Sequence, residues 1–190
     1  MKQQIAKIVL CLSGWKFEIH SDIVGIDKAI ILAAPHTSEW DFVLGKLMYV
    51  AMGLNVKFLI AQEFFFFPLG ILLKGLGAYP INRKNPRTVI ELKQQIQVSK
   101  QFIITFCPEG TRKKTDNWGN GFYKLAIRAG IPIFLAYLDY GNKYCIVGKS
   151  FQMSGNFDHD MKQLKLFYRQ DMAKYQQQFA FHQHKIVNCE

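Results

Sequence analysis

A histidine and an aspartate separated by four residues form the first group that could carry out acid–base chemistry. They are His36 and Asp41, in the segment Ala34-Pro35-His36-Thr37-Ser38-Glu39-Trp40-Asp41. A carboxylate that accepts a hydrogen bond from one ring nitrogen fixes the imidazole tautomer, and the second nitrogen can then take a proton from a hydroxyl group. The same spacing also suits a helix cap beside an ordinary loop histidine. The pair alone does not choose between these interpretations.

A second polar group is the segment Pro108-Glu109-Gly110-Thr111-Arg112, which also follows an apolar stretch. Gly110 permits unusual backbone angles, and the Glu109 carboxylate can bind a polyol. The planar Arg112 guanidinium suits a phosphate or a carboxylate. By itself, Pro-Glu-Gly is also typical of a solvated turn. Two polar groups at the ends of two apolar stretches nevertheless favour a functional site.

A third group is basic. Arg83 follows the short segment 77–82. Together with Arg112, Lys113 and Lys114 it can form a pocket for an anion, provided that the preceding strands are neighbours. A solvated basic surface is the alternative.

Short apolar stretches alternate with longer periodic ones, a pattern typical of strands and helices around a parallel sheet. We therefore expect an α/β fold: one domain with a mainly parallel central sheet, flanking helices and an N-terminal amphipathic helix. The expected strands are 16–20, 29–34, 56–61, 78–81, 101–107, 133–138 and 143–147. The expected helices are 41–52, 63–76, 86–99, 123–129 and, from apolar residues three and four apart, 161–179. Ligands usually bind at the carboxyl ends of such strands, where both polar segments fall.

In this order, the segments resemble the four motifs of the glycerolipid acyltransferase family, whose best-known members are the 1-acylglycerol-3-phosphate acyltransferases. The matching segments are His36-x4-Asp41, 77–83, 108–112 and 131–133, so the resemblance spans about residues 30–136. The chain departs from the family at Cys107, where Phe is frequent, and at Lys113, where Ser is frequent. The resemblance implies a short bacterial-type α/β enzyme that uses an acyl thioester at a membrane surface.

The resemblance also implies roles for individual residues. His36 would be the general base on the acceptor hydroxyl, and Asp41 would orient it. The acceptor site would be formed by Arg83, Glu109, Gly110, Thr111 and Arg112, with the two arginines at a phosphate or other anionic group. The implied reaction is O-acyl transfer from acyl carrier protein or coenzyme A to a lysophospholipid-like acceptor. The first candidate is 1-acylglycerol-3-phosphate, and a lyso aminolipid is the alternative.

Composition limits the other possibilities. The 190 residues, 49% of them hydrophobic, fit a single domain over 1–190. The net charge of +10 favours an anionic partner. A non-catalytic basic module that binds lipid or nucleic acid is the alternative from another class. No nucleic-acid-binding signature is evident, so no such partner is expected. The scattered cysteines, and the isolated pair His182 and His184, predict neither a metal nor a cofactor beyond the thioester co-substrate.

Two apolar segments point to the surface of a membrane. No stretch of the sequence reaches the roughly 18 to 20 apolar residues that a spanning helix needs. Residues 1–15 predict an amphipathic helix at the membrane surface. The rings of Phe64–Phe67 cannot all face one core, because four consecutive residues cover every face of a helix. With lysines around both segments, we expect a cytoplasmic protein bound peripherally to the anionic inner face of the cell membrane.

Overall fold

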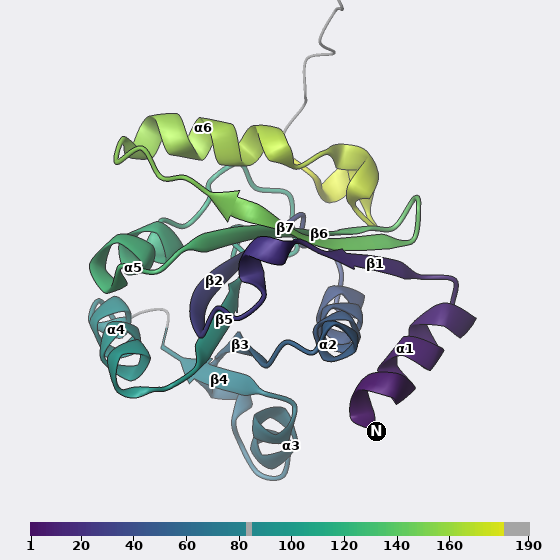
Figure 1. The fold of residues 1–190 in the computed structure, drawn as a ribbon. Helices are drawn as coiled ribbons and strands as arrows, with labels where there is room; N and C mark the ends of the chain where they lie inside the picture. Colours follow the sequence, from purple (N-terminus) through teal and green to yellow (C-terminus); the bar gives the residue numbers. More distant parts are fainter. Residues whose placement is uncertain (83–84, 181–190) are drawn as a thin grey trace, which may run out of the picture.

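The computed structural model describes residues 1–82 and 85–180. Its centre is a seven-stranded sheet in the order β1-β7-β6-β2-β5-β3-β4, with helices packed around it (Figure 1). The strands are β1 (Lys16–Ile19), β2 (Lys28–Ala33), β3 (Val56–Ala61), β4 (Ala78–Ile81), β5 (Phe102–Phe106), β6 (Ile133–Asp139) and β7 (Tyr144–Phe151). The α-helices are α1 (Lys2–Leu12), α2 (Trp40–Met52), α3 (Leu69–Gly75), α4 (Thr88–Val98), α5 (Gly121–Ala129) and α6 (Phe157–Phe167).

Most of the sheet is parallel. The neighbouring strands β6, β2, β5, β3 and β4 run in one direction, whereas β7 is antiparallel to β6 and β1 runs parallel to β7. The central strand β2 is an uninterrupted apolar run from Ala29 to Ala33, as expected for a parallel strand covered on both faces. Its Ile30 pairs with Ile104 of β5 and Ile133 of β6. The α/β fold with a mainly parallel sheet is confirmed.

Alternate residues of β2 serve two separate cores. Ile30 and Leu32 point into a large core that includes side chains of α4, α5 and α6. Ala29 and Ile31 point to the other face, where they pack with Tyr49 of α2. This alternation is the period of two that a strand imposes on its side chains. Because helices cover both faces of the sheet, polar groups can gather at the ends of its strands.

The N-terminal helix predicted from the sequence is present as α1. It packs on α2 through Ala6 and Leu10, which are buried with Met48 and Ala51. Gln3 adds a hydrogen bond from its amide nitrogen to the carbonyl oxygen of Ala51 (3.1 Å). Other apolar side chains of this helix stay exposed: Ile5, Ile8, Val9 and Leu12.

The helix predicted over 63–76 is wrong in its first half. A short 3-10 turn, η2 (Gln62–Phe64), follows β3, and the α-helix begins only at Leu69. The reason is Pro68, whose ring disfavours a helical conformation for the residue before it and which has no N–H for an α-helical ladder. Phe65, Phe66 and Phe67 therefore lie in a connecting segment.

The helix predicted over 161–179 is confirmed as far as Phe167 and is wrong beyond it. The helix α6 spans Phe157–Phe167, and two 3-10 turns follow, η3 (Gln170–Met172) and η4 (Gln176–Gln178). Tyr168 leaves the helix in an extended conformation, and its buried hydroxyl donates to the carbonyl oxygen of Leu32 at 2.7 Å. The three- and four-residue spacing correctly predicted that Tyr168, Met172 and Phe179 are buried, although Tyr175 is exposed. Beyond Phe167 these side chains pack from 3-10 turns and extended segments and not from an α-helix.

Candidate active site

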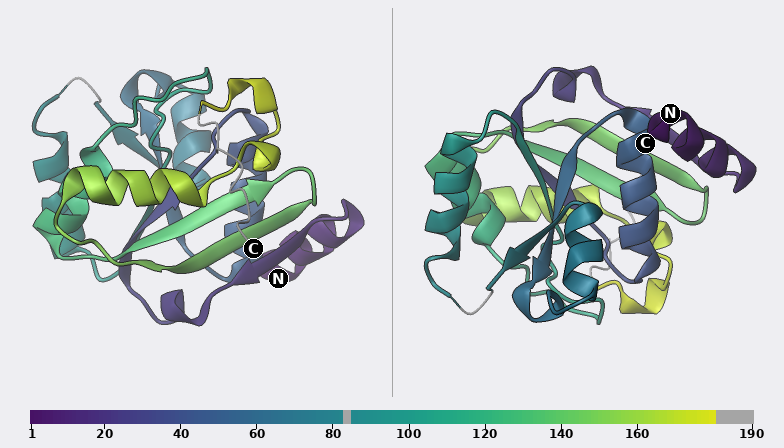
Figure 2. Two further views of the ribbon diagram at one scale, coloured as in Figure 1. Left: turned by 90° about the horizontal axis from the view of Figure 1, so that it is seen from above. Right: turned by 90° about the horizontal axis from the view of Figure 1, so that it is seen from below.

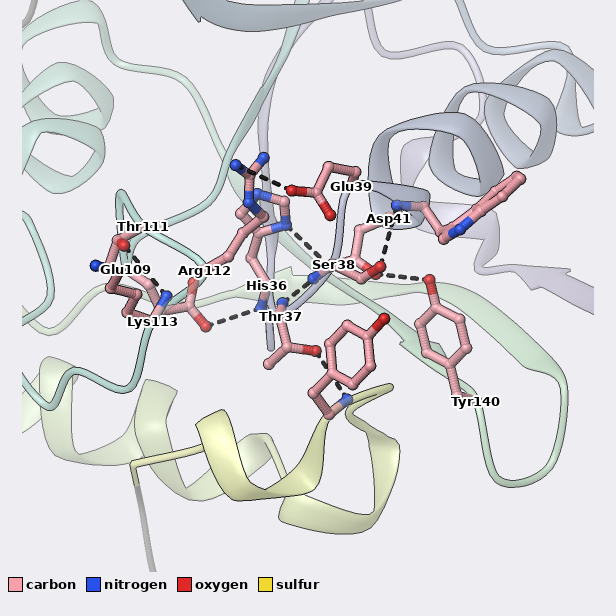
Figure 3. A network of polar contacts seen from close by, with 12 residues as sticks. His36, Thr37, Ser38, Glu39, Asp41, Glu109, Thr111, Arg112, Lys113 and Tyr140 are labelled. Carbon is pink, nitrogen blue, oxygen red and sulfur yellow. Dashed lines mark hydrogen bonds and ion pairs between the residues drawn. The ribbon is translucent and has the colours of Figure 1, made fainter.

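Three neighbouring strands bring polar groups to one edge of the sheet. His36 follows β2, Glu109 follows β5 and Tyr140 follows β6, and β2 lies between the other two strands. Because these strands are parallel, their carboxyl ends meet at the same edge. The backbone N–H of His36 donates to Glu109 Oε1 at 3.1 Å (Figure 3). Two of the segments singled out in the sequence are therefore in direct contact.

His36 and Asp41 form the predicted pair. His36 Nδ1 lies 2.9 Å from Asp41 Oδ2, and the two side chains are 21% and 10% exposed. A carboxylate only accepts hydrogen bonds, so Nδ1 carries the hydrogen and Nε2 of the neutral ring is left as an acceptor. The geometry thus leaves Nε2 able to take a proton from a hydroxyl group.

The same carboxylate also holds the start of α2. Asp41 Oδ2 accepts from the backbone N–H groups of Thr37 (2.9 Å) and Ser38 (3.0 Å). In return, Ser38 Oγ accepts from the backbone N–H of Trp40 at 3.2 Å. These bonds satisfy donors that a helix start leaves without partners, as in a capping box. The sequence suggested either a helix cap or a His–Asp pair. In the structure the same Asp41 carboxylate forms both.

Tyr140 belongs to this site and was missed in the sequence. Its hydroxyl donates to Asp41 Oδ1 at 2.6 Å, the oxygen that His36 does not contact (Figure 3). Burial and the hydrogen bond to Asp41 both raise the pKa of Tyr140 far above its usual value, so the hydroxyl stays protonated and acts as a donor. The one sequence signal was its place in a turn directly after β6, at the carboxyl end of a strand.

Glu109 is the most perturbed carboxyl group of the site. Its Oε1 accepts from His36, whereas within the described residues its buried Oε2 has no hydrogen-bond partner. Burial raises the pKa of Glu109 to about 7, although the hydrogen bond from the His36 backbone and the charge of His36 oppose the change. Near neutral pH this group can therefore exist in either protonation state beside the imidazole.

The rest of this segment forms an exposed turn. Gly110 has a positive φ of 63°, which favours glycine, and Thr111 Oγ1 accepts from the backbone N–H of Lys113 at 3.2 Å. Arg112 Nη2 lies 3.2 Å from Glu39 Oε1, with side chains 50% and 75% exposed. Such an exposed ion pair contributes little stability and can be exchanged for another anion.

A family model described as "Acyltransferase" matches residues 16–137, which include the His–Asp pair, Glu109 and Arg112. The chain belongs to the acyltransferase family. This acyltransferase is therefore an enzyme, which sets aside the non-catalytic basic module considered above. No curated protein sequence matches the chain.

A solved structure supports the fold of this acyltransferase. It is the crystal structure of the 1-acyl-sn-glycerophosphate (LPA) acyltransferase PlsC from Thermotoga maritima, with a TM-score of 0.59. The match covers 87% of this chain and 74% of that one, at 14% sequence identity. At this identity the likeness shows a shared arrangement of helices and strands.

The strand β4 and the segment after α6 also reach this side of the molecule. Arg83, the predicted partner of Arg112, lies outside the described residues, so their common anion pocket remains a prediction; β4, which precedes Arg83, does end at the same edge of the sheet. The segment after α6 lies against the loop that follows β2, where the backbone N–H of Tyr175 donates to Thr37 Oγ1 at 3.3 Å. A small cavity lies where the loops after β2 and β5 meet the segment after α6. It is lined by Pro35, His36, Thr37, Glu109, Lys113, Thr115, Gln178, Phe179 and Ala180.

Proposed function

We propose that this acyltransferase transfers an acyl group from a thioester, carried by acyl carrier protein or coenzyme A, to the hydroxyl of a lysophospholipid-like acceptor. The observation that carries the proposal is the 2.9 Å contact between His36 Nδ1 and Asp41 Oδ2 at the carboxyl end of β2. This contact keeps the ring hydrogen on Nδ1, so Nε2 can accept a proton from a hydroxyl group.

In this mechanism, His36 acts as the general base. Nε2 takes the proton of the acceptor hydroxyl as the oxygen attacks the thioester carbonyl carbon. The new C–O bond forms, the C–S bond breaks, and the thiolate leaves and is protonated by the imidazolium. Asp41 orients the ring and stabilises its positive charge. General base catalysis of this kind contributes on the order of 10² to 10⁴ in rate.

The acceptor would be held on the Glu109 side of His36. Glu109 Oε2 is buried, while Oε1 of the same carboxyl group accepts from the backbone N–H of His36. With a pKa of about 7, the carboxyl group can donate to or accept from a second hydroxyl of the acceptor. Arg112 would leave Glu39 and bind an anionic head group through two hydrogen bonds, with Arg83 in support. Gly110 and Thr111 would shape this turn. A phosphate-bearing acceptor such as 1-acylglycerol-3-phosphate fits these groups.

A lyso aminolipid is a second candidate acceptor because of Glu39. This carboxylate lies 3.2 Å from the cation that would bind the anionic head group. A head group with both an ammonium and an anionic group could pair with Glu39 and Arg112 at once, whereas a phosphate monoester must displace Glu39. Comparing lysolipids with and without an amino group separates the two candidates.

The decisive experiment measures thiol release from acyl-coenzyme A and acyl carrier protein with a panel of lysolipids. We expect turnover by the wild type and a loss of at least about 100-fold for His36→Ala. His159→Ala is a matched control, because His159 is exposed on the first turn of α6. Full activity of His36→Ala, or no turnover with any pair of substrates, would contradict the proposal.

Two exposed apolar surfaces suit a peripheral contact with the membrane. One is the outer side of α1, with Ile5, Ile8 and Leu12, and the other surrounds α3, with Phe64, Phe66, Phe67, Ile71 and Leu72. Both helices project from the lower side of the molecule in Figure 1 and lie toward the viewer when it is seen from below (Figure 2). Exposed lysines accompany them, Lys2 and Lys7 on α1 and Lys74 on α3. Among the described residues, no helix is long and apolar enough to cross a bilayer.

We predict that these surfaces bind the anionic inner leaflet of the cell membrane. Flotation with vesicles that contain an anionic lipid should show binding that weakens in high salt, because charge attracts the protein and apolar insertion retains it. Replacing Phe66 and Phe67 with Ser should release most of the protein. The control replaces Val98 and Leu166, exposed apolar residues on α4 and α6, with Ser. Equal flotation of all three proteins would contradict the prediction.

A further inference from the structure

Asp41 receives hydrogen bonds from two sides. On the loop side, Oδ2 accepts from His36 Nδ1 and from the backbone N–H groups of Thr37 and Ser38. On the opposite side, Oδ1 accepts from the Tyr140 hydroxyl at 2.6 Å. The first three donors belong to the same short segment as Asp41, so they move with it. Tyr140 is 99 residues away in sequence and provides a contact to a different part of the fold.

Tyr140 is itself held in place by three parts of the molecule. It lies in the turn between β6 and β7, where the buried Asp139 accepts from both the backbone and the side-chain nitrogen of Asn142 at 2.9 Å. Its backbone N–H donates to the carbonyl oxygen of Met172, in the segment after α6 (3.1 Å). Its ring meets Trp15, which follows α1, edge to face at 5.3 Å. These contacts fix the position of the hydroxyl before any substrate arrives.

We propose that Tyr140 is a positioning residue of this acyltransferase, which sets the orientation of the Asp41 carboxylate and, through it, of His36. A carboxylate rotates about its last torsion, which has broad minima. With Oδ1 bonded to a phenol anchored elsewhere, Oδ2 is kept directed at His36 Nδ1. The neutral His36 ring then keeps its hydrogen on Nδ1 before each proton transfer, and Nε2 keeps its direction toward the acceptor. The proposal rests on the proposed catalytic role of His36.

The hydroxyl is suited to this task and not to proton transfer. Burial and Asp41 both keep its proton in place, as the raised pKa of Tyr140 indicates. The ammonium of Lys174 lies 5.7 Å from the centre of the Tyr140 ring and 5.3 Å from that of the Trp40 ring, so a cation packs against both aromatic rings. Tyr140 therefore remains a hydrogen-bond donor to Asp41 Oδ1.

The first test uses nitrogen NMR of the histidine rings and needs no substrate. In the wild type we expect His36 in the Nδ1–H tautomer, with an Nδ1–H signal protected from exchange with water. In Tyr140→Phe the ring remains packed but the hydroxyl is lost, so this signal should broaden and the second tautomer should appear. The matched control is Tyr144→Phe on the same hairpin, whose hydroxyl also donates to a carboxylate, Glu18, at the outer edge of the sheet. An unchanged His36 signal in Tyr140→Phe would overturn the proposal.

The second test is steady-state kinetics of the same variants. Tyr140→Phe should lower kcat about tenfold, the scale of one charge-assisted hydrogen bond expressed in the transition state, and leave both KM values unchanged. Tyr144→Phe should behave like the wild type. Equal losses in both variants would mean that Tyr140 only stabilises the hairpin. Because the NMR test does not depend on turnover, it separates failure of this proposal from failure of the acyl-transfer proposal, which His36→Ala tests.

Discussion

The two ends of the candidate site are built in opposite ways. At one end, four hydrogen bonds from His36, Thr37, Ser38 and Tyr140 converge on the Asp41 carboxylate, which is 10% exposed. At the other end, Arg112 is 50% exposed and forms an ion pair with Glu39, which is 75% exposed. The buried end is preorganised for one geometry, and the exposed end can exchange its partner. We expect substitutions at the first to change the rate of the reaction and substitutions at the second to change the choice of acceptor.

The largest effect is expected at the buried end. Asp41→Asn replaces a carboxylate that accepts four hydrogen bonds with an amide that has one accepting oxygen, and it permits the wrong imidazole tautomer. We predict a loss in kcat of about 100-fold or more, measured by thiol release. Asp27→Asn is the control, because Asp27 precedes β2 at the opposite edge of the sheet, where its side chain accepts a hydrogen bond from Gln101. A loss below tenfold in Asp41→Asn would mean that this end is not preorganised for catalysis.

Glu109 tests whether the buried end lowers the free energy of unfolding as the pH rises. Its pKa rises to about 7 on folding because of burial. A raised pKa stabilises the folded state below the unfolded value, near 4.3, and that contribution is lost as the pH rises to about 7. We predict that Glu109→Gln removes this dependence, which amounts to at most about 4 kcal/mol in the free energy of unfolding.

The measurement for Glu109 is urea unfolding at pH 5 and at pH 8. The wild type should lose stability relative to Glu109→Gln between these two values, whereas the exposed control Glu63→Gln should follow the wild type. If the difference between the wild type and Glu109→Gln is the same at both pH values, the carboxyl group is not buried in the way that the structure indicates.

The same contrast explains what could be predicted from the sequence. His36 and Asp41 lie within one loop and the first helical turn after it, so their contact is local and the spacing indicates it. The contact between His36 and Glu109 depends on two neighbouring strands, and the apolar stretches before both segments predicted the ends of those strands. Both inferences depend on buried parallel strands, which appear in a sequence as continuous apolar runs.

The features that were missed depend on contacts that have no local pattern. Tyr140 is a single tyrosine in a hairpin turn, and only the order of β5, β2 and β6 in the sheet places it beside Asp41. The segment after α6 was mistaken for a helix because Tyr168, Met172 and Phe179 are buried at helical spacing. Their spacing reports that they face the interior, and a hydrogen bond from Tyr168 to β2 decides the backbone conformation instead.

The smallest effect is expected at the exposed end, where it concerns the acceptor. Glu39→Gln frees Arg112 from an ion pair that is worth at most about 1 kcal/mol, so KM for a phosphate-bearing lysolipid should fall about threefold to fivefold with kcat unchanged. For an aminolipid acceptor KM should rise, because the partner of the ammonium is lost. Asp158→Asn makes the same change of charge on α6, which begins at the opposite edge of the sheet, and controls for net charge. If Glu39→Gln lowers kcat as Asp41→Asn does, Glu39 belongs to the preorganised end, and the division of labour between the two ends is wrong.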